Sequence, residues 1–103
     1  MRLETSDNPR RSRFELHVDG ELVGFADYRL LSDVLSLPHT EVQSKHRGRG
    51  FASTLIRNTL DTARQRGLAV LPQCPFVSQY IAEHPDYLPL VPADQRDRFG
   101  LPA

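Results

Sequence analysis

The sequence predicts a mixed α/β (α+β) fold, in which an antiparallel meander of strands leads into a β-loop-α-β unit and a short C-terminal helix follows. Three observations predict this arrangement. Apolar and polar residues alternate within residues 14–43, as they do in half-buried strands. A loop rich in glycine and arginine then precedes residues 51–66, whose apolar side chains recur at helical spacing. A short apolar run at residues 68–71 follows that helix.

The meander is indicated by its turns. Asp19-Gly20 is a strong signal for a two-residue hairpin, and Ser32-Asp33 marks a second turn. Pro38 cannot donate a backbone hydrogen bond, so it is expected to bend or interrupt its strand as a bulge. Asp7-Asn8-Pro9 marks an earlier turn, which follows a short polar segment. The expected strands are an edge strand at residues 2–6 and three further strands at residues 14–18, 21–31 and 34–43.

The second half of the chain is predicted from its helix signals. Gly67 is suited to a C-terminal cap, so the first helix should end at Arg66. Residues 68–71 then fit a buried strand parallel to the one before the helix. Pro75 suits a first helical position and predicts a short helix that ends near His84. We therefore expect one domain over residues 1–92 and a loosely held tail at residues 93–103.

Charge is unevenly distributed although the net charge is zero. Residues 14–43 carry six acids and one base, whereas residues 44–66 carry six bases and one acid. This pattern favours a local anion site and disfavours a nucleic-acid-binding surface, which is usually basic overall. No apolar run is long enough for a membrane span, and no secretory leader is recognisable. The single cysteine favours a cytoplasmic protein, and the scattered histidines show no metal-ligand spacing.

The anion site is expected in the loop at residues 45–50. Gly48 and Gly50 allow unusual backbone dihedrals and close approach of another molecule. The first N–H groups of the following helix have no intrahelical partner and carry the positive end of its dipole. A phosphate or pyrophosphate fits such a site. A Walker loop is excluded because no Lys-Ser or Lys-Thr pair follows, and a dinucleotide fingerprint lacks its third glycine.

This stretch also resembles a known sequence motif. Residues 47–52 read Arg-Gly-Arg-Gly-Phe-Ala and are similar to motif A of the GNAT acetyltransferases, R-x-x-G-x-G/A, with Val42 five residues earlier. The likeness covers about residues 4–91. Three further segments resemble the small YjdJ-type branch of that superfamily: His39-Thr40-Glu41-Val42, Cys74-Pro75-Phe76-Val77 and His84-Pro85-Asp86-Tyr87.

The resemblance implies that the chain binds acetyl-CoA or coenzyme A. In that superfamily the pyrophosphate lies on the loop and helix N-terminus, and the pantetheine runs beside the preceding strand. Tyr80 would close the cofactor groove or donate to the thiolate, or else pack in the core, and Phe51 equally suits a core position. The implied cofactor-binding residues are Val42, Arg47, Gly48, Arg49, Gly50, Phe51, Ala52, Ser53 and Tyr80.

The implied reaction, acyl transfer from a thioester to an amine, needs a group that removes a proton from the ammonium. Glu41 and His39 lie two residues apart on a strand and share a face, so either is a candidate catalytic base. The alternative is that Glu41 is a solvent-facing strand residue and His39 a hydrogen-bonded turn residue. Cys74 precedes the second helix, and three roles remain open for it: acyl acceptor, proton donor to the thiolate, or buried packing residue.

The sequence is therefore interpreted as an acetyl-CoA-dependent N-acetyltransferase acting on an unidentified amine. It leaves no room for the helices that wall the acceptor site in larger relatives, which permits a protein or peptide amine as the acceptor. The alternative is a coenzyme A-binding module without turnover, since both functions need the same loop. Acyl-CoA and an amine are the expected partners, nucleic acid and membrane are not expected, and the oligomeric state is not predicted.

Overall fold

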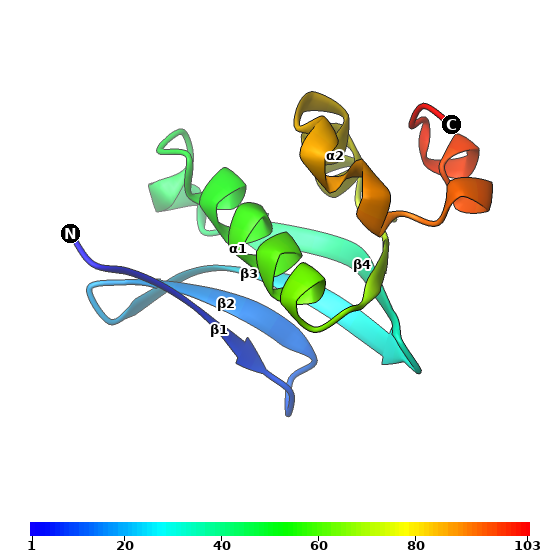
Figure 1. Ribbon diagram of the computed structural model, residues 1–103. Coiled ribbons are helices and arrows are strands. Elements are labelled where there is room, and N and C mark those ends of the chain that lie inside the picture. The colour runs from blue at the N-terminus through cyan, green and yellow to red at the C-terminus, as the bar shows by residue number, and fades with distance from the viewer.

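The computed structural model describes all residues, 1–103, and combines one five-stranded sheet with two α-helices and four short 3-10 segments (Figure 1). Its strands and helices are β1 (Leu3–Asn8), β2 (Arg13–Val18), β3 (Glu21–Leu31), β4 (Val34–Val42), α1 (Phe51–Gln65), β5 (Ala69–Leu71) and α2 (Pro75–Glu83). The 3-10 segments are Ser44–His46, Pro85–Leu90, Ala93–Gln95 and Asp97–Phe99.

The sheet has the order β1-β2-β3-β4-β5, with antiparallel pairing up to β4 and a parallel pair between β4 and β5. The predicted meander and β-loop-α-β unit are therefore confirmed. The first strand runs two residues past its expected end at Ser6, because Asp7 pairs with Phe14 and Asn8 with Arg13. The turn signalled by Asp7-Asn8-Pro9 accordingly begins after Asn8.

A bulge at Pro38 divides β4 into two halves. Asp27 pairs with His39 and Arg29 with Ser36, so β4 holds one residue more than β3 between these pairs. The extra residue reverses which side chains face the helices. Leu37 is fully buried before the bulge, whereas beyond it His39 and Glu41 are exposed. The bulge expected from the sequence therefore decides the face on which the two candidate bases lie.

Helix α1 lies across one face of the sheet, and α2 lies beside α1, on the side where β4 runs (Figure 1). The helices and the inner face of the sheet share one hydrophobic core. Gly67, with φ of 68°, follows the last turn of α1 as its predicted cap. Neither helix is long and apolar enough to cross a membrane. The buried residues of α1 are Phe51, Leu55, Ile56, Thr59, Leu60 and Ala63, and those of α2 are Val77, Tyr80 and Ile81.

The C-terminal residues 93–103 form two short 3-10 segments. Leu101 is only 5% exposed and belongs to the hydrophobic core. Its N–H donates to the Arg96 carbonyl, and the Arg96 Nε donates to the Val91 carbonyl at 2.9 Å. These contacts attach the segment to the domain, and Phe99 also packs against the core. The division at residue 92 and the looseness of the tail stay predictions.

Candidate functional site

The candidate site begins where β4 loses its second neighbour. Strand β5 pairs only with Val34–Ser36, and the Cys74 N–H then donates to the Leu37 carbonyl at 2.8 Å. Beyond that point residues 39–42 pair with β3 alone. The second half of β4 therefore presents one free edge toward α2.

The polar groups along this free edge follow from the register. The Gln43 N–H donates to the Val23 carbonyl at 2.9 Å, and backbone groups alternate in direction along an antiparallel strand. The backbone groups of Thr40 and Val42 therefore point away from β3. Consistent with this, the Val42 carbonyl accepts a hydrogen bond from Arg47. An extended ligand with amide groups can pair with such an edge as an added strand would.

The loop between β4 and α1 offers a row of free backbone donors. Gly48 and Gly50 have φ of 81° and 78°, in the left-handed region that favours glycine. The N–H groups of residues 48–53 donate to no other group of the protein, and the first helical bond runs from the Thr54 N–H to the Gly50 carbonyl. No acidic side chain lies in the first turn of α1. Free donors and the positive end of the dipole together make an anion site.

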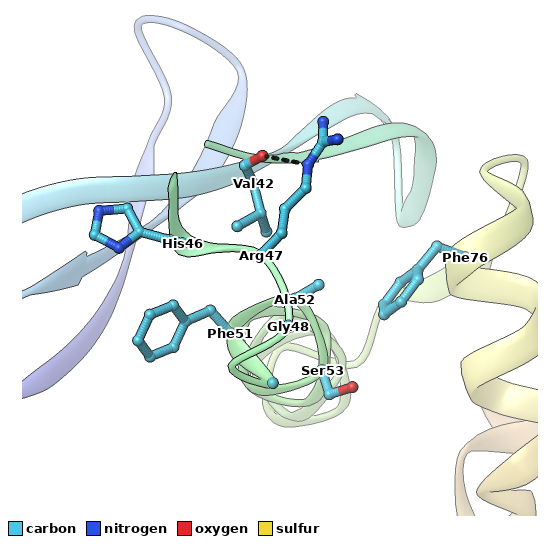
Figure 2. A pocket seen from close by; sticks show the side chains of 9 residues that line it. Val42, His46, Arg47, Gly48, Phe51, Ala52, Ser53 and Phe76 are labelled. Atoms are coloured by element: carbon cyan, nitrogen blue, oxygen red, sulfur yellow. Dashed lines mark hydrogen bonds between the residues drawn. The ribbon is translucent and has the colours of Figure 1, made fainter. Parts of the chain in front are cut away.

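Two adjoining hollows connect this loop with the free edge of β4. One has a volume of about 230 Å³ and the other about 310 Å³, and they share Val42, Arg47, Ala52 and Phe76. Figure 2 shows the Phe76 ring on α2 facing the start of α1, where Ala52 and Ser53 lie. The first hollow is lined by Val42, His46, Arg47, Gly48, Gly50, Phe51, Ala52, Ser53 and Phe76, and the second by His39, Thr40, Glu41, Val42, Arg47, Ala52 and Phe76.

Most predicted cofactor residues therefore meet in one groove, with Arg49 and Tyr80 outside the two hollows. Arg49 makes no hydrogen bond or ion pair, and Tyr80 lines a smaller hollow that continues past Ser53. Tyr80 is 7% exposed and stacks on His84 with ring centroids 4.0 Å apart; burial raises the pKa of Tyr80. Phe51 is 5% exposed, so its ring also belongs to the core.

Sequence reasoning missed three residues of the groove, Thr40, His46 and Phe76. The signal for Phe76 was its place directly after Pro75, which puts a large apolar side chain in the first turn of α2; it is 40% exposed. His46 lies in the 3-10 segment of the loop, and its Nδ1 is buried without a partner. A contact distant in sequence places Phe76 beside the glycines, whereas His46 lies only two residues before Gly48 and pairs with Glu21.

Glu21 in the β2–β3 hairpin holds the loop from outside the groove. It accepts from Lys45 Nζ at 2.9 Å and pairs with His46 Nε2 at 3.1 Å. The hydrogen bond from Lys45, followed by that of His46, holds the pKa of Glu21 below its usual value. Lys45 is the first residue of the loop predicted to form the anion site, but this ion pair directs its charge toward Glu21. The cations left for the loop are Arg47 and Arg49.

The candidate bases lie together, whereas Cys74 lies apart from them. His39 Nε2 is 3.2 Å from Glu41 Oε1, and both side chains are 54% exposed on the outer face of the sheet. The Phe25 ring lies edge-on to His39, with centroids 6.2 Å apart. Cys74 is 7% exposed at the N-cap of α2 and lines neither hollow. This burial favours the packing role among the three proposed for it.

The chain is similar to several known proteins. It is 36% identical over 66 residues to streptothricin acetyltransferase from Streptomyces lavendulae, covering 62% of this chain and 35% of that protein. It is 35% identical over 52 residues to the human protein NATD1, covering 50% and 46% of the two chains. The chain thus spans less than half the length of these relatives.

The fold is also found among solved structures. The NMR structure of a GCN5-like protein from Staphylococcus aureus superposes with a TM-score of 0.66 at 18% identity, covering 87% of this chain and 88% of that one. A family model described as GCN5-related N-acetyl-transferase matches residues 13–90, which include the sheet from β2 to β5, the glycine loop and both helices. By this match the chain belongs to the GCN5-related N-acetyltransferase family.

Proposed function

We propose that the chain binds acetyl-CoA and transfers its acetyl group to an amine. The observation that carries the proposal is the row of free N–H groups at residues 48–53, which ends on the N-terminus of a 15-residue helix. A pyrophosphate placed there accepts several hydrogen bonds at once and interacts favourably with the helix dipole. The family to which the chain belongs supports this choice of anion.

The free edge of β4 supplies the second half of the cofactor site. A pantetheine arm contains two amide groups on an extended chain, and the backbone groups of Thr40 and Val42 that point away from β3 suit such a partner. Phe76 and Ala52 provide apolar walls on the other side of the groove. The arm would then run from the loop toward the Pro38 bulge, which places the thioester at the end of the groove near His39 and Glu41.

The acceptor amine must lose a proton before it attacks the thioester. Glu41 and His39 remain the candidate bases, and their hydrogen bond allows a proton taken by one to be shared with the other. Both are solvent-exposed, so a water molecule can also carry the proton. No helix follows β1 to cover the outer face of the sheet, which leaves room there for an acceptor as large as a peptide or protein end.

Substitution at Ala52 tests the anion site with little risk to the fold. A glutamate in the first turn of a helix is favourable for the helix itself, but at Ala52 it places a carboxylate among the free donors. We expect Ala52→Glu to lose coenzyme A binding in calorimetry. Ala52→Gln is the matched control, because it adds nearly the same volume without the charge. Equal affinity of the two variants would contradict an anion site at this loop.

Turnover needs a separate measurement. A mass-resolved screen of small amines and peptides with acetyl-CoA should yield products heavier by one acetyl group. Binding of coenzyme A without any product would instead identify the chain as a coenzyme A-binding module, the alternative considered from the sequence. Running the binding assay beside the screen separates these two outcomes.

A further inference from the structure

One side chain links the two halves of the groove. Arg47 rises from the glycine loop, and its Nε donates to the Val42 carbonyl at 3.4 Å (Figure 2). Arg47 also lines both hollows. Its hydrogen bond therefore uses an acceptor that the free edge of β4 would otherwise offer to an extended ligand.

We propose that Arg47 determines ligand specificity, because it leaves the Val42 carbonyl available to a ligand only when a pyrophosphate lies in the loop. The inference rests on the proposed function, because it assumes that acyl-CoA is the ligand. A pantetheine amide can pair with the carbonyl only after the guanidinium leaves it. A pyrophosphate at residues 48–53 offers the guanidinium a charged partner, and charge-assisted hydrogen bonds are stronger than neutral ones.

For a ligand without the pyrophosphate, Arg47 loses its hydrogen bond to Val42 and gains no charged partner. Plain pantetheine must displace Arg47 from the Val42 carbonyl and gives the guanidinium only water in return. A net hydrogen bond of this kind changes affinity by about threefold to tenfold. Arg47 thus favours acyl groups carried on coenzyme A over acyl groups carried on pantetheine alone.

The neighbouring cations are not placed to do this. Lys45 is paired with Glu21 at 2.9 Å, outside the groove. Arg49 makes no hydrogen bond or ion pair and lines neither hollow, although it lies in the same loop. Arg49 can add attraction to an anion but does not occupy the carbonyl. It is therefore a matched control for Arg47, with the same charge and no contact to β4.

NMR titration of the 15N-labelled protein with pantetheine and with coenzyme A tests the proposal, since it measures dissociation constants up to the millimolar range. We expect Arg47→Ala to bind pantetheine about threefold to tenfold more tightly than the unmodified chain does. The same variant should bind coenzyme A more weakly, about tenfold, because a phosphate contact is lost. Arg49→Ala should also weaken coenzyme A binding and leave the pantetheine affinity unchanged.

The two proposals fail in different ways. If the unmodified chain binds coenzyme A but Arg47→Ala does not improve pantetheine binding, the specificity role of Arg47 is overturned and the proposed function stands. Improved pantetheine binding by both arginine variants would overturn it as well, because a general charge effect would then explain the result. If the unmodified chain does not bind coenzyme A at all, the proposed function fails and the inference fails with it.

Discussion

Gly24 in β3 gives a way to move the free edge of β4 without touching the ligand. It pairs with Val42, and a Cβ added at Gly24 would lie 2.8 Å from the Glu41 carbonyl oxygen and 3.1 Å from Val42 Cγ2. The contact with the Glu41 carbonyl oxygen is shorter than real Cβ atoms show and the contact with Val42 is unusually tight, so Gly24→Ala must push β4 outward by a few tenths of an ångström. Overpacking of this kind costs about 1–3 kcal/mol. We expect the urea midpoint to fall by about 1 M and coenzyme A affinity to fall by about threefold or more.

Gly20→Ala is the control for this experiment. Gly20 lies in the β2–β3 turn with φ of 85°, and a Cβ there would meet nothing within 4 Å. Its substitution costs about 1–2 kcal/mol through backbone strain alone. Both variants should therefore lose stability, but only Gly24→Ala should lose coenzyme A affinity. A Gly24→Ala variant as stable as the unmodified chain, or an equal loss of affinity in both, would refute this reasoning.

The chemistry and the pH response can be tested in the same way. Replacing Glu41 by Gln or His39 by Ala should lower kcat by about 10²–10⁴ for the residue that acts as base, with coenzyme A affinity unchanged; full turnover in both excludes them. Cys74→Ala should cost about 1 kcal/mol of stability and keep most activity, and intact mass should show no acetyl adduct on the unmodified chain. Burial raises the pKa of Tyr28 and of Tyr87 from 10.0 to about 12. Because each folded pKa lies above the unfolded one, this stabilisation is complete below pH 10 and is lost as pH rises toward 12; urea midpoints that do not fall between pH 9 and pH 11.5 would contradict it.

The parts of the fold that local signals determine were predictable. Asp19-Gly20 forms the expected hairpin turn, with φ of 51° and 85°, because both residues tolerate the left-handed region. Gly67 ends α1, and Pro75 begins α2 at its first position. The glycine loop was predictable for the same reason, because glycines such as Gly48 directly before a helix indicate unusual backbone dihedrals and free N–H groups.

Side-chain contacts between distant segments were not predictable. β1 extends to Asn8 because polar side chains in it find partners elsewhere: the Tyr28 hydroxyl donates to Asp7 at 2.7 Å, and the Asn8 amide donates to Glu15. The spacing of apolar residues does not predict hydrogen bonds between polar side chains. Nor could the sequence show that Glu21 would pair with Lys45.

Backbone amide shifts on adding coenzyme A test the central claim most directly. In 15N-labelled protein, the amide signals of residues 48–53 should move most, since their N–H groups donate to no other group of the protein. The amides of residues 40 and 42, at the free edge of β4, should move next. Shifts confined to other parts of the chain, or none at saturating coenzyme A, would contradict the assignment of this loop and edge as the cofactor site.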